Sequence, residues 1–108
     1  MSDPSYPLAI VPYAQAAAVI EGDGTILRAL GIDEVRKTAD GSYAVKVSGE
    51  VDLEKSVPTA TLIARADPSV PAQIYLDLQA DGGDPHTFGV TTYAGAARVD
   101  SPFTVIVP

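Results

Sequence analysis

Residues Ile32 to Val51 read Ile-Asp-Glu-Val-Arg-Lys-Thr-Ala-Asp-Gly-Ser-Tyr-Ala-Val-Lys-Val-Ser-Gly-Glu-Val. Asp40-Gly41 separates two runs that suit strands, and an Asp-Gly pair tolerates the positive φ angles of a tight hairpin turn. The second run alternates with a period of two, so one set of side chains faces a core and the other faces solvent. The expected inward set is Tyr43, Val45, Val47 and Val51, and the expected outward set is Ala44, Lys46, Ser48 and Glu50. The stretch predicts a β-hairpin.

The rest of the chain repeats this pattern of short apolar runs between turn residues. Strands are expected over 13–20, 25–30, 59–66, 73–79, 87–93 and 103–107, and a loop is expected over 95–100. The Ala-rich segment 13–20 also suits a helix, but its end leads straight into Glu21-Gly22-Asp23-Gly24, which favours a strand and a turn. About seven or eight strands at roughly ten-residue spacing predict an all-β fold, an antiparallel β-sandwich or jelly roll. Tyr43 and Phe103 are expected in its core.

The first twelve residues differ from the rest because they contain three prolines, which disfavour a regular helix and favour an extended N-terminal arm. Leu8 to Val11 make the arm apolar. Two interpretations are open: an edge strand that covers its own core, or an arm that lies on a neighbouring subunit. Residues 13–108 are expected to form a single β-sandwich domain.

Composition limits the possible partners. The chain has 108 residues, of which 46% are hydrophobic, with two Phe and no Trp. A core of such small side chains is thin, so an oligomer could supply further burial. The net charge of −7 argues against binding to nucleic acid or to an anionic membrane surface. The simpler interpretation is that the negative charge keeps the protein soluble.

The sequence contains no cysteine, so disulfides and thiolate metal sites are excluded. No apolar run approaches the ~18 residues of a membrane-spanning helix. The N-terminus lacks the basic and apolar regions of a secretion signal. We therefore expect synthesis in a host cytoplasm without a signal peptide.

A search for catalytic or metal-binding patterns is negative, so we expect no enzymatic activity, cofactor or metal. The single histidine, His86, lies in a loop, and no Gly-x-Ser-x-Gly motif accompanies it. Asp81, Asp84 and His86 could meet a cation, but turn formation explains both aspartates more simply. The Gly22-Asp23-Gly24 turn lacks the spaced ligands of a calcium loop.

The exposed aromatic positions are the candidate contacts for a partner or ligand. Tyr75 falls on the polar face of its predicted strand, and Tyr93 faces away from Phe88 and Val90. Tyrosines at such positions stack on sugar rings or on protein surfaces, and together with His86 they form the candidate set. The alternative is ordinary cross-strand packing.

Three motifs carry a resemblance to a known group of proteins. Gly24 to Lys37 read Gly-Thr-Ile-Leu-Arg-Ala-Leu-Gly-Ile-Asp-Glu-Val-Arg-Lys, and Gly41 to Val47 read Gly-Ser-Tyr-Ala-Val-Lys-Val. Val99 to Val107 read Val-Asp-Ser-Pro-Phe-Thr-Val-Ile-Val, which resembles an Asp-x-Pro-Phe-x-Val-x-Val ending. In this order the motifs resemble small β domains of phage tail fibres and bacterial collagen-like proteins.

Such domains are similar to the jelly rolls of the C1q and tumour necrosis factor type, and the resemblance implies trimers and binding rather than catalysis. The proline-bearing arm stands in the place of their stalk, which favours a free-standing virion component. We therefore expect a non-enzymatic structural or attachment protein of a phage or prophage virion, such as a tail or fibre accessory or a capsid decoration. It is expected to act as a homotrimer with protein partners in a larger assembly. The alternative function is a carbohydrate- or ligand-binding module.

Overall fold

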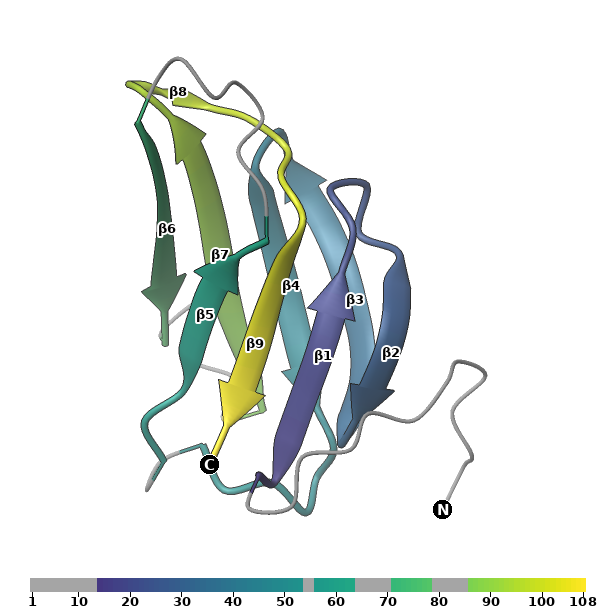
Figure 1. Cartoon of the computed structure of the whole chain (residues 1–108). Helices are drawn as coiled ribbons and strands as arrows, with labels where there is room; N and C mark the ends of the chain where they lie inside the picture. Colours follow the sequence, from purple (N-terminus) through teal and green to yellow (C-terminus); the bar gives the residue numbers. More distant parts are fainter. Residues whose placement is uncertain (1–13, 54–55, 64–70, 79–85) are drawn as a thin grey trace.

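The described residues form two antiparallel sheets that pack face to face (Figure 1). The structure is a computed structural model and describes residues 14–53, 56–63, 71–78 and 86–108. Sheet A has the strand order β2 (Ile26–Leu30), β1 (Ala16–Ile20), β9 (Phe103–Val107) and β5 (Thr59–Leu62). Sheet B has the order β3 (Ile32–Ala39), β4 (Ser42–Val47), β7 (Thr87–Ala94) and β6 (Ala72–Asp77), with β8 (Ala97–Arg98) paired to β7. The predicted all-β sandwich is confirmed.

The predicted hairpin is the β3–β4 pair. Val35 lies opposite Val45, and the chain reverses at Asp40-Gly41. Gly41 has a φ of 68°, and a Cβ atom there would lie 2.7 Å from the Thr92 carbonyl oxygen. Both observations explain why glycine occupies this turn, since other residues rarely adopt that φ and a side chain would collide with β7.

The Ala-rich segment forms β1, a central strand of sheet A. It pairs with β2 on one side and with β9 on the other. Ala16 and Ala18 are 0% and 3% exposed and face the opposite sheet. The packing between two strands therefore overrides the helix propensity of alanine in this segment.

The chain passes from sheet A to sheet B at Gly31, between β2 and β3. Gly31 has a φ of 67°, and a Cβ atom there would lie 2.5 Å from the backbone oxygen of Gln15. The two strands thus meet at a sharp corner that lies against the start of β1. Only a residue without a side chain fits this corner without moving β1.

The core lies between the two sheets and contains both residues expected there. Tyr43 and Phe103 are 2% and 0% exposed, and their ring centroids lie 4.9 Å apart. The alternation predicted for the hairpin and for the last two long strands is confirmed. The other buried core residues are mainly Ala, Val and Ile, namely Ala16, Ala18, Ile20, Ala29, Ile32, Val45, Val47, Val51, Phe88, Val90, Val105 and Val107.

Some boundaries differ from the prediction. The segment expected as a loop over 95–100 contains β8, because Ala97 pairs back with Ala94 after a tight turn. The strand expected over 73–79 ends at Asp77, and Leu78 is 52% exposed. The strand expected over 59–66 ends at Leu62. The predicted arm, residues 1–12, lies outside the described residues.

Ala44 is a further difference within the hairpin. It was expected on the wet face, and it does point away from the core, yet it is 7% exposed.

Candidate functional site

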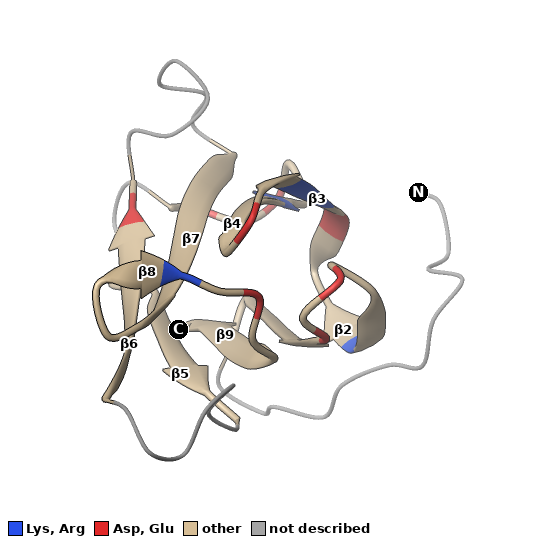
Figure 2. Cartoon of the chain, turned by 90° about the horizontal axis from the view of Figure 1, so that it is seen from above, with Lys and Arg blue, Asp and Glu red and all other residues tan. Residues whose placement is uncertain are grey.

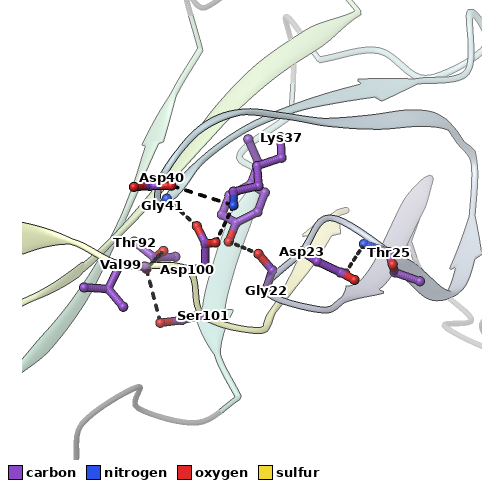
Figure 3. A network of polar contacts seen from close by, with 11 residues as sticks. Gly22, Asp23, Thr25, Lys37, Asp40, Gly41, Thr92, Val99, Asp100 and Ser101 are labelled. Atoms are coloured by element: carbon purple, nitrogen blue, oxygen red, sulfur yellow. Dashed lines mark hydrogen bonds and ion pairs between the residues drawn. The ribbon is translucent and has the colours of Figure 1, made fainter.

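A network of polar contacts joins two turns and the segment before β9 at one end of the sandwich (Figure 3). The Asp100 carboxylate accepts hydrogen bonds from the Gly41 N–H, at 2.6 Å, and from the Lys37 ammonium group. The Tyr43 hydroxyl donates to the Gly22 carbonyl oxygen at 2.7 Å. These bonds join the β3–β4 turn, the segment before β9 and the β1–β2 turn.

The electrostatics of this network favour a charged, structural aspartate. The hydrogen bond from Lys37, and then that from the Gly41 N–H, lower the pKa of Asp100 below its ordinary value of 3.8. The bond to Asp100 in turn raises the pKa of Lys37 above 10.5. Burial, followed by the Asp100 charge, raises the pKa of the Tyr43 phenol above 10.0. A general acid would need a raised carboxyl pKa, so Asp100 is suited to anchoring and not to proton transfer.

The other polar side chains nearby satisfy one another. The Thr92 hydroxyl donates to the Val99 carbonyl oxygen at 2.6 Å. Throughout the described part of the chain, each buried side-chain nitrogen or oxygen atom has a hydrogen-bond partner. The network therefore holds the turns in place, and among the described residues it leaves no buried side-chain polar atom without a partner.

Two of the three candidate contact residues come together on the outer face of sheet B. The Tyr75 and Tyr93 ring centroids lie 5.6 Å apart at an interplanar angle of 82°. Tyr75 is 53% exposed, and its hydroxyl donates to Gln73 Oε1 at 2.8 Å. The two rings thus pack on each other across β6 and β7, and this contact holds one exposed aromatic ring in a defined position.

His86 does not join this pair. It directly precedes β7, whereas Tyr93 lies near the other end of that strand, roughly 20 Å away at the rise of an extended chain. Its carbonyl oxygen accepts a hydrogen bond from the Val47 N–H at 2.8 Å. Asp81 and Asp84 lie outside the described residues. Among the residues that are described, no group of three His, Cys, Asp or Glu side chains could hold a metal ion.

A shallow hollow lies beside the tyrosine pair on the same face of sheet B. Its volume is about 250 Å³. The strand pairing places four residues in one row across the sheet, in the order Arg36, Ala44, Gly89 and Asp77. All four line the hollow, together with Thr38, Ser42 and Thr91. Ala44, which is 7% exposed, is thus one of the residues on the floor of this hollow.

The outer face of sheet A has a different character. Its four strands read AAAVI, ILRAL, TATL and FTVIV, and Arg28 is the single charged residue in them. The strands of sheet B contain Asp33, Glu34, Arg36, Lys37, Lys46, Asp77 and Arg98. Figure 2 shows this contrast, with β5 and β9 free of charged residues and β3 carrying both signs.

Sequence reasoning missed both surfaces for different reasons. The hollow has no sequence signal, because its floor residues come from strands that are far apart along the chain. The low charge of the strands of sheet A is visible in the sequence, but only the strand pairing shows that these strands share one face.

Comparison with known proteins found no match, whether by family, by curated protein sequence or by solved structure. The comparisons identify no family, and the fold supports the resemblance drawn from the motifs at the level of an all-β domain of two antiparallel sheets. Among the described residues, no helix is long and apolar enough to cross a membrane.

Proposed function

We propose that this chain is a non-enzymatic structural or attachment protein that associates with copies of itself through the outer face of sheet A. The observation that carries the proposal is the near absence of charge on the four strands of that sheet. From the motif resemblance we infer that the protein belongs to a phage or prophage virion and that it forms a homotrimer.

The exposed side chains on this face support association. The strand register places Ile106 between Ala17 of β1 and Thr59 of β5. Ile106 is 40% exposed, and Val57 and Ile63, which flank β5, are 74% and 51% exposed. A surface of this kind loses unfavourable contact with water when another apolar surface covers it.

The charge of the chain favours this face over the others. Each copy has a formal net charge of −7, so copies repel one another wherever acidic groups meet. The strands of sheet A contain no acidic residue. Contact through this face therefore removes apolar area from water without placing carboxylates of two copies against each other.

The solution mass tests the proposal. We expect light scattering of the wild-type protein to give about three times the chain mass of 11.2 kDa. Ile106→Glu places a negative charge in the middle of this face, whose strands contain no acidic residue, so we expect it to give the mass of one chain. Thr61→Glu is a second variant on the same face. It replaces an exposed polar residue with a charged one, and we expect it to give the mass of one chain as well.

Leu78→Glu is the matched control. It introduces the same charge at a leucine that is 52% exposed and follows β6 of sheet B, so the trimer should persist. Circular dichroism establishes that each variant is folded. A single-chain mass for the folded wild-type protein, or a trimer that survives both substitutions on sheet A, would contradict the proposal.

A further inference from the structure

Strand β6 lies at the edge of sheet B, and on its open side it pairs with no other described strand (Figure 1). On its paired side, the Gly95 N–H donates to the carbonyl oxygen of Pro71, one residue before β6, at 2.7 Å. Opposite Ile74, the Thr92 N–H points away from β6 and donates to the Gly41 carbonyl oxygen at 2.8 Å. Hydrogen-bonded pairs alternate along an antiparallel ladder. The backbone groups that point to the open side therefore belong to Ala72, Ile74 and Leu76.

The other three described edge strands carry features that discourage pairing with a further strand. Strand β3 has four charged residues and two register shifts against β4. Strand β2 contains Arg28 and lies beside a register shift in β1, and β5 has four residues. Charges, bulges and short length protect the exposed edges of sheets. Strand β6 has six residues in an unbroken register with β7, and its single charge is Asp77 at the end. It is therefore the edge best suited to accept another strand.

We propose that β6 pairs with β6 of a second copy of this chain, antiparallel and about a two-fold axis at Ile74. In this register Ile74 lies opposite Ile74 of the partner subunit, and Ala72 lies opposite Leu76 of the partner subunit. All three residues that face the open side then exchange backbone hydrogen bonds, about six across the joint. The pairing makes one continuous sheet from two copies of sheet B and covers both exposed edges.

The side chains of β6 suit this register on both faces of the sheet. On the inner face, Ile74 and Leu76 are partly buried and pack against the core, and each meets an apolar residue across the joint. On the outer face, Tyr75 lies opposite Gln73 of the partner subunit. Both side chains are exposed, and within one chain the Tyr75 hydroxyl already donates to Gln73 Oε1 at 2.8 Å. The joint therefore continues the apolar inner face and covers exposed aromatic surface.

The acidic residue of β6 does not oppose this register. Asp77 lies opposite Pro71 of the partner subunit, at the end of the joint. The two Asp77 residues are then about 20 Å apart at the rise of an extended strand, which exceeds the ~8–10 Å screening length of physiological salt. A joint of six residues is nevertheless small, and each copy has a net charge of −7. We therefore expect the pairing to be weak and to form at high protein concentration.

The inference goes beyond the proposed function, because it concerns the edge of sheet B and not the outer face of sheet A. A trimer formed through sheet A has three β6 edges, each of which can pair with an edge of another trimer. Two independent joints of this kind build a larger assembly from a single chain. At low protein concentration, the expected mass is still that of the trimer.

Amide hydrogen exchange, followed by nuclear magnetic resonance on the full 108-residue protein, tests the joint. We expect the three edge amides of β6 to exchange more slowly as the protein concentration rises from about 50 μM to about 1 mM. Ala60 and Leu62 are the internal control. The Ile63 N–H donates to the Pro102 carbonyl oxygen of the neighbouring segment, so the N–H groups of Ala60 and Leu62 point to the open edge of β5. Their exchange rates should not change.

Two matched double variants test the register. Gln73→Glu with Tyr75→Glu places carboxylates opposite each other across the joint, so the edge amides should stay unprotected and the mass should not rise with concentration. Gln73→Lys with Tyr75→Glu places opposite charges there and should restore both effects. Both positions are exposed, and both variants lose the contact between Tyr75 and Tyr93 equally. Circular dichroism establishes that each variant is folded.

Three results would overturn the β6 joint. These are edge amides whose exchange does not depend on concentration, equal protection in the two folded double variants, or equal protection of the edge amides of β5 and β6. Ile106→Glu, which removes the contact through sheet A, should rise from one chain to two with concentration. A wild-type protein that is a single chain at low concentration and pairs through β6 would contradict the proposed function alone. A trimer whose β6 edge amides stay unprotected would contradict this inference alone.

Discussion

Asp100 shows how much a single residue contributes through partners that are remote in sequence. Its carboxylate bonds to Lys37 and to the Gly41 N–H, 63 and 59 positions earlier in the chain. These contacts fasten the hairpin turn to the segment that leads into β9. Local patterning placed Tyr43 and Phe103 in the core, because burial follows from alternation within one strand. The role of Asp100 could not be predicted, because it depends on where a distant turn lies.

The lowered pKa of Asp100 predicts an acid dependence of stability. Since its pKa is lower in the folded protein than in the unfolded chain, its contribution to the free energy of unfolding is complete above about 3.8, the ordinary aspartate value. That contribution is lost as the pH falls through the lower, folded value. Asp100→Asn removes it, so the thermal midpoint should fall less between pH 7 and pH 3 than it does in the wild type.

Asp40→Asn is the control for this measurement. The Asp40 carboxylate lies 3.8 Å from the Lys37 ammonium nitrogen, but its side chain is 90% exposed, so solvent screens the pair. We expect the wild-type acid dependence to persist in this variant. Identical pH profiles for Asp100→Asn and the wild type would show that the network adds nothing to acid stability.

Individual strands were predicted with differing success, and the reasons are physical. Inward apolar residues recur at every second position in β4, β7 and β9, so the existence and the inward faces of these strands followed from the sequence. The β1 segment depended on its neighbours, because alanine has no strong preference for a strand and gains its place by packing between β2 and β9. Strand β8 was missed because it has two residues, which pair with β7 across a tight turn and show no alternation.

The corner at Gly31 gives a prediction about how β2 and β3 join. Gly31→Ala forces a Cβ atom to within 2.5 Å of the Gln15 backbone oxygen and keeps an unfavourable positive φ. The unfavourable φ should lower the free energy of unfolding by about 1–2 kcal/mol, and the collision by about 1–3 kcal/mol more. Urea denaturation measures the total.

Gly95→Ala isolates the cost of the positive φ angle. Gly95 has a φ of 62°, but no atom lies within 4 Å of the position of a Cβ atom there. We expect it to lose about 1–2 kcal/mol, from the φ angle alone. Equal losses in the two variants would mean that β1 moves aside easily, and that the corner does not need a glycine for space.

Considered as a whole molecule, the chain has two outer faces of opposite character joined by one thin core. The described core residues lie between Ala16 and Val107, and both sheets contribute to them. The N-terminal arm, predicted over residues 1–12, lies outside the described residues. Its place, on its own domain or on a neighbouring subunit, stays a prediction.

Removal of the arm tests the independence of the sandwich. A protein that begins at Ala14 should fold with a thermal midpoint within about 5 °C of the full chain, a change equivalent to about 1 kcal/mol for a domain of this size. Failure to fold would show that the arm belongs to the core. If the shortened protein folds and keeps the trimer, sheet A alone carries assembly; if it folds as a monomer, the arm is the assembly element.

Sequence alone determined the all-β class, the inward faces of the main strands and the turn at Gly41, because each depends on neighbours a few residues apart. It also determined the net charge that disfavours nucleic acid. Only the tertiary structure decided which strands share a sheet, and with that the face of sheet A with almost no charge and the row from Arg36 to Asp77. Those features arise from pairing between strands distant in sequence. The alternation within a strand predicts which of its side chains point outward, but it does not predict which other strands lie beside that strand.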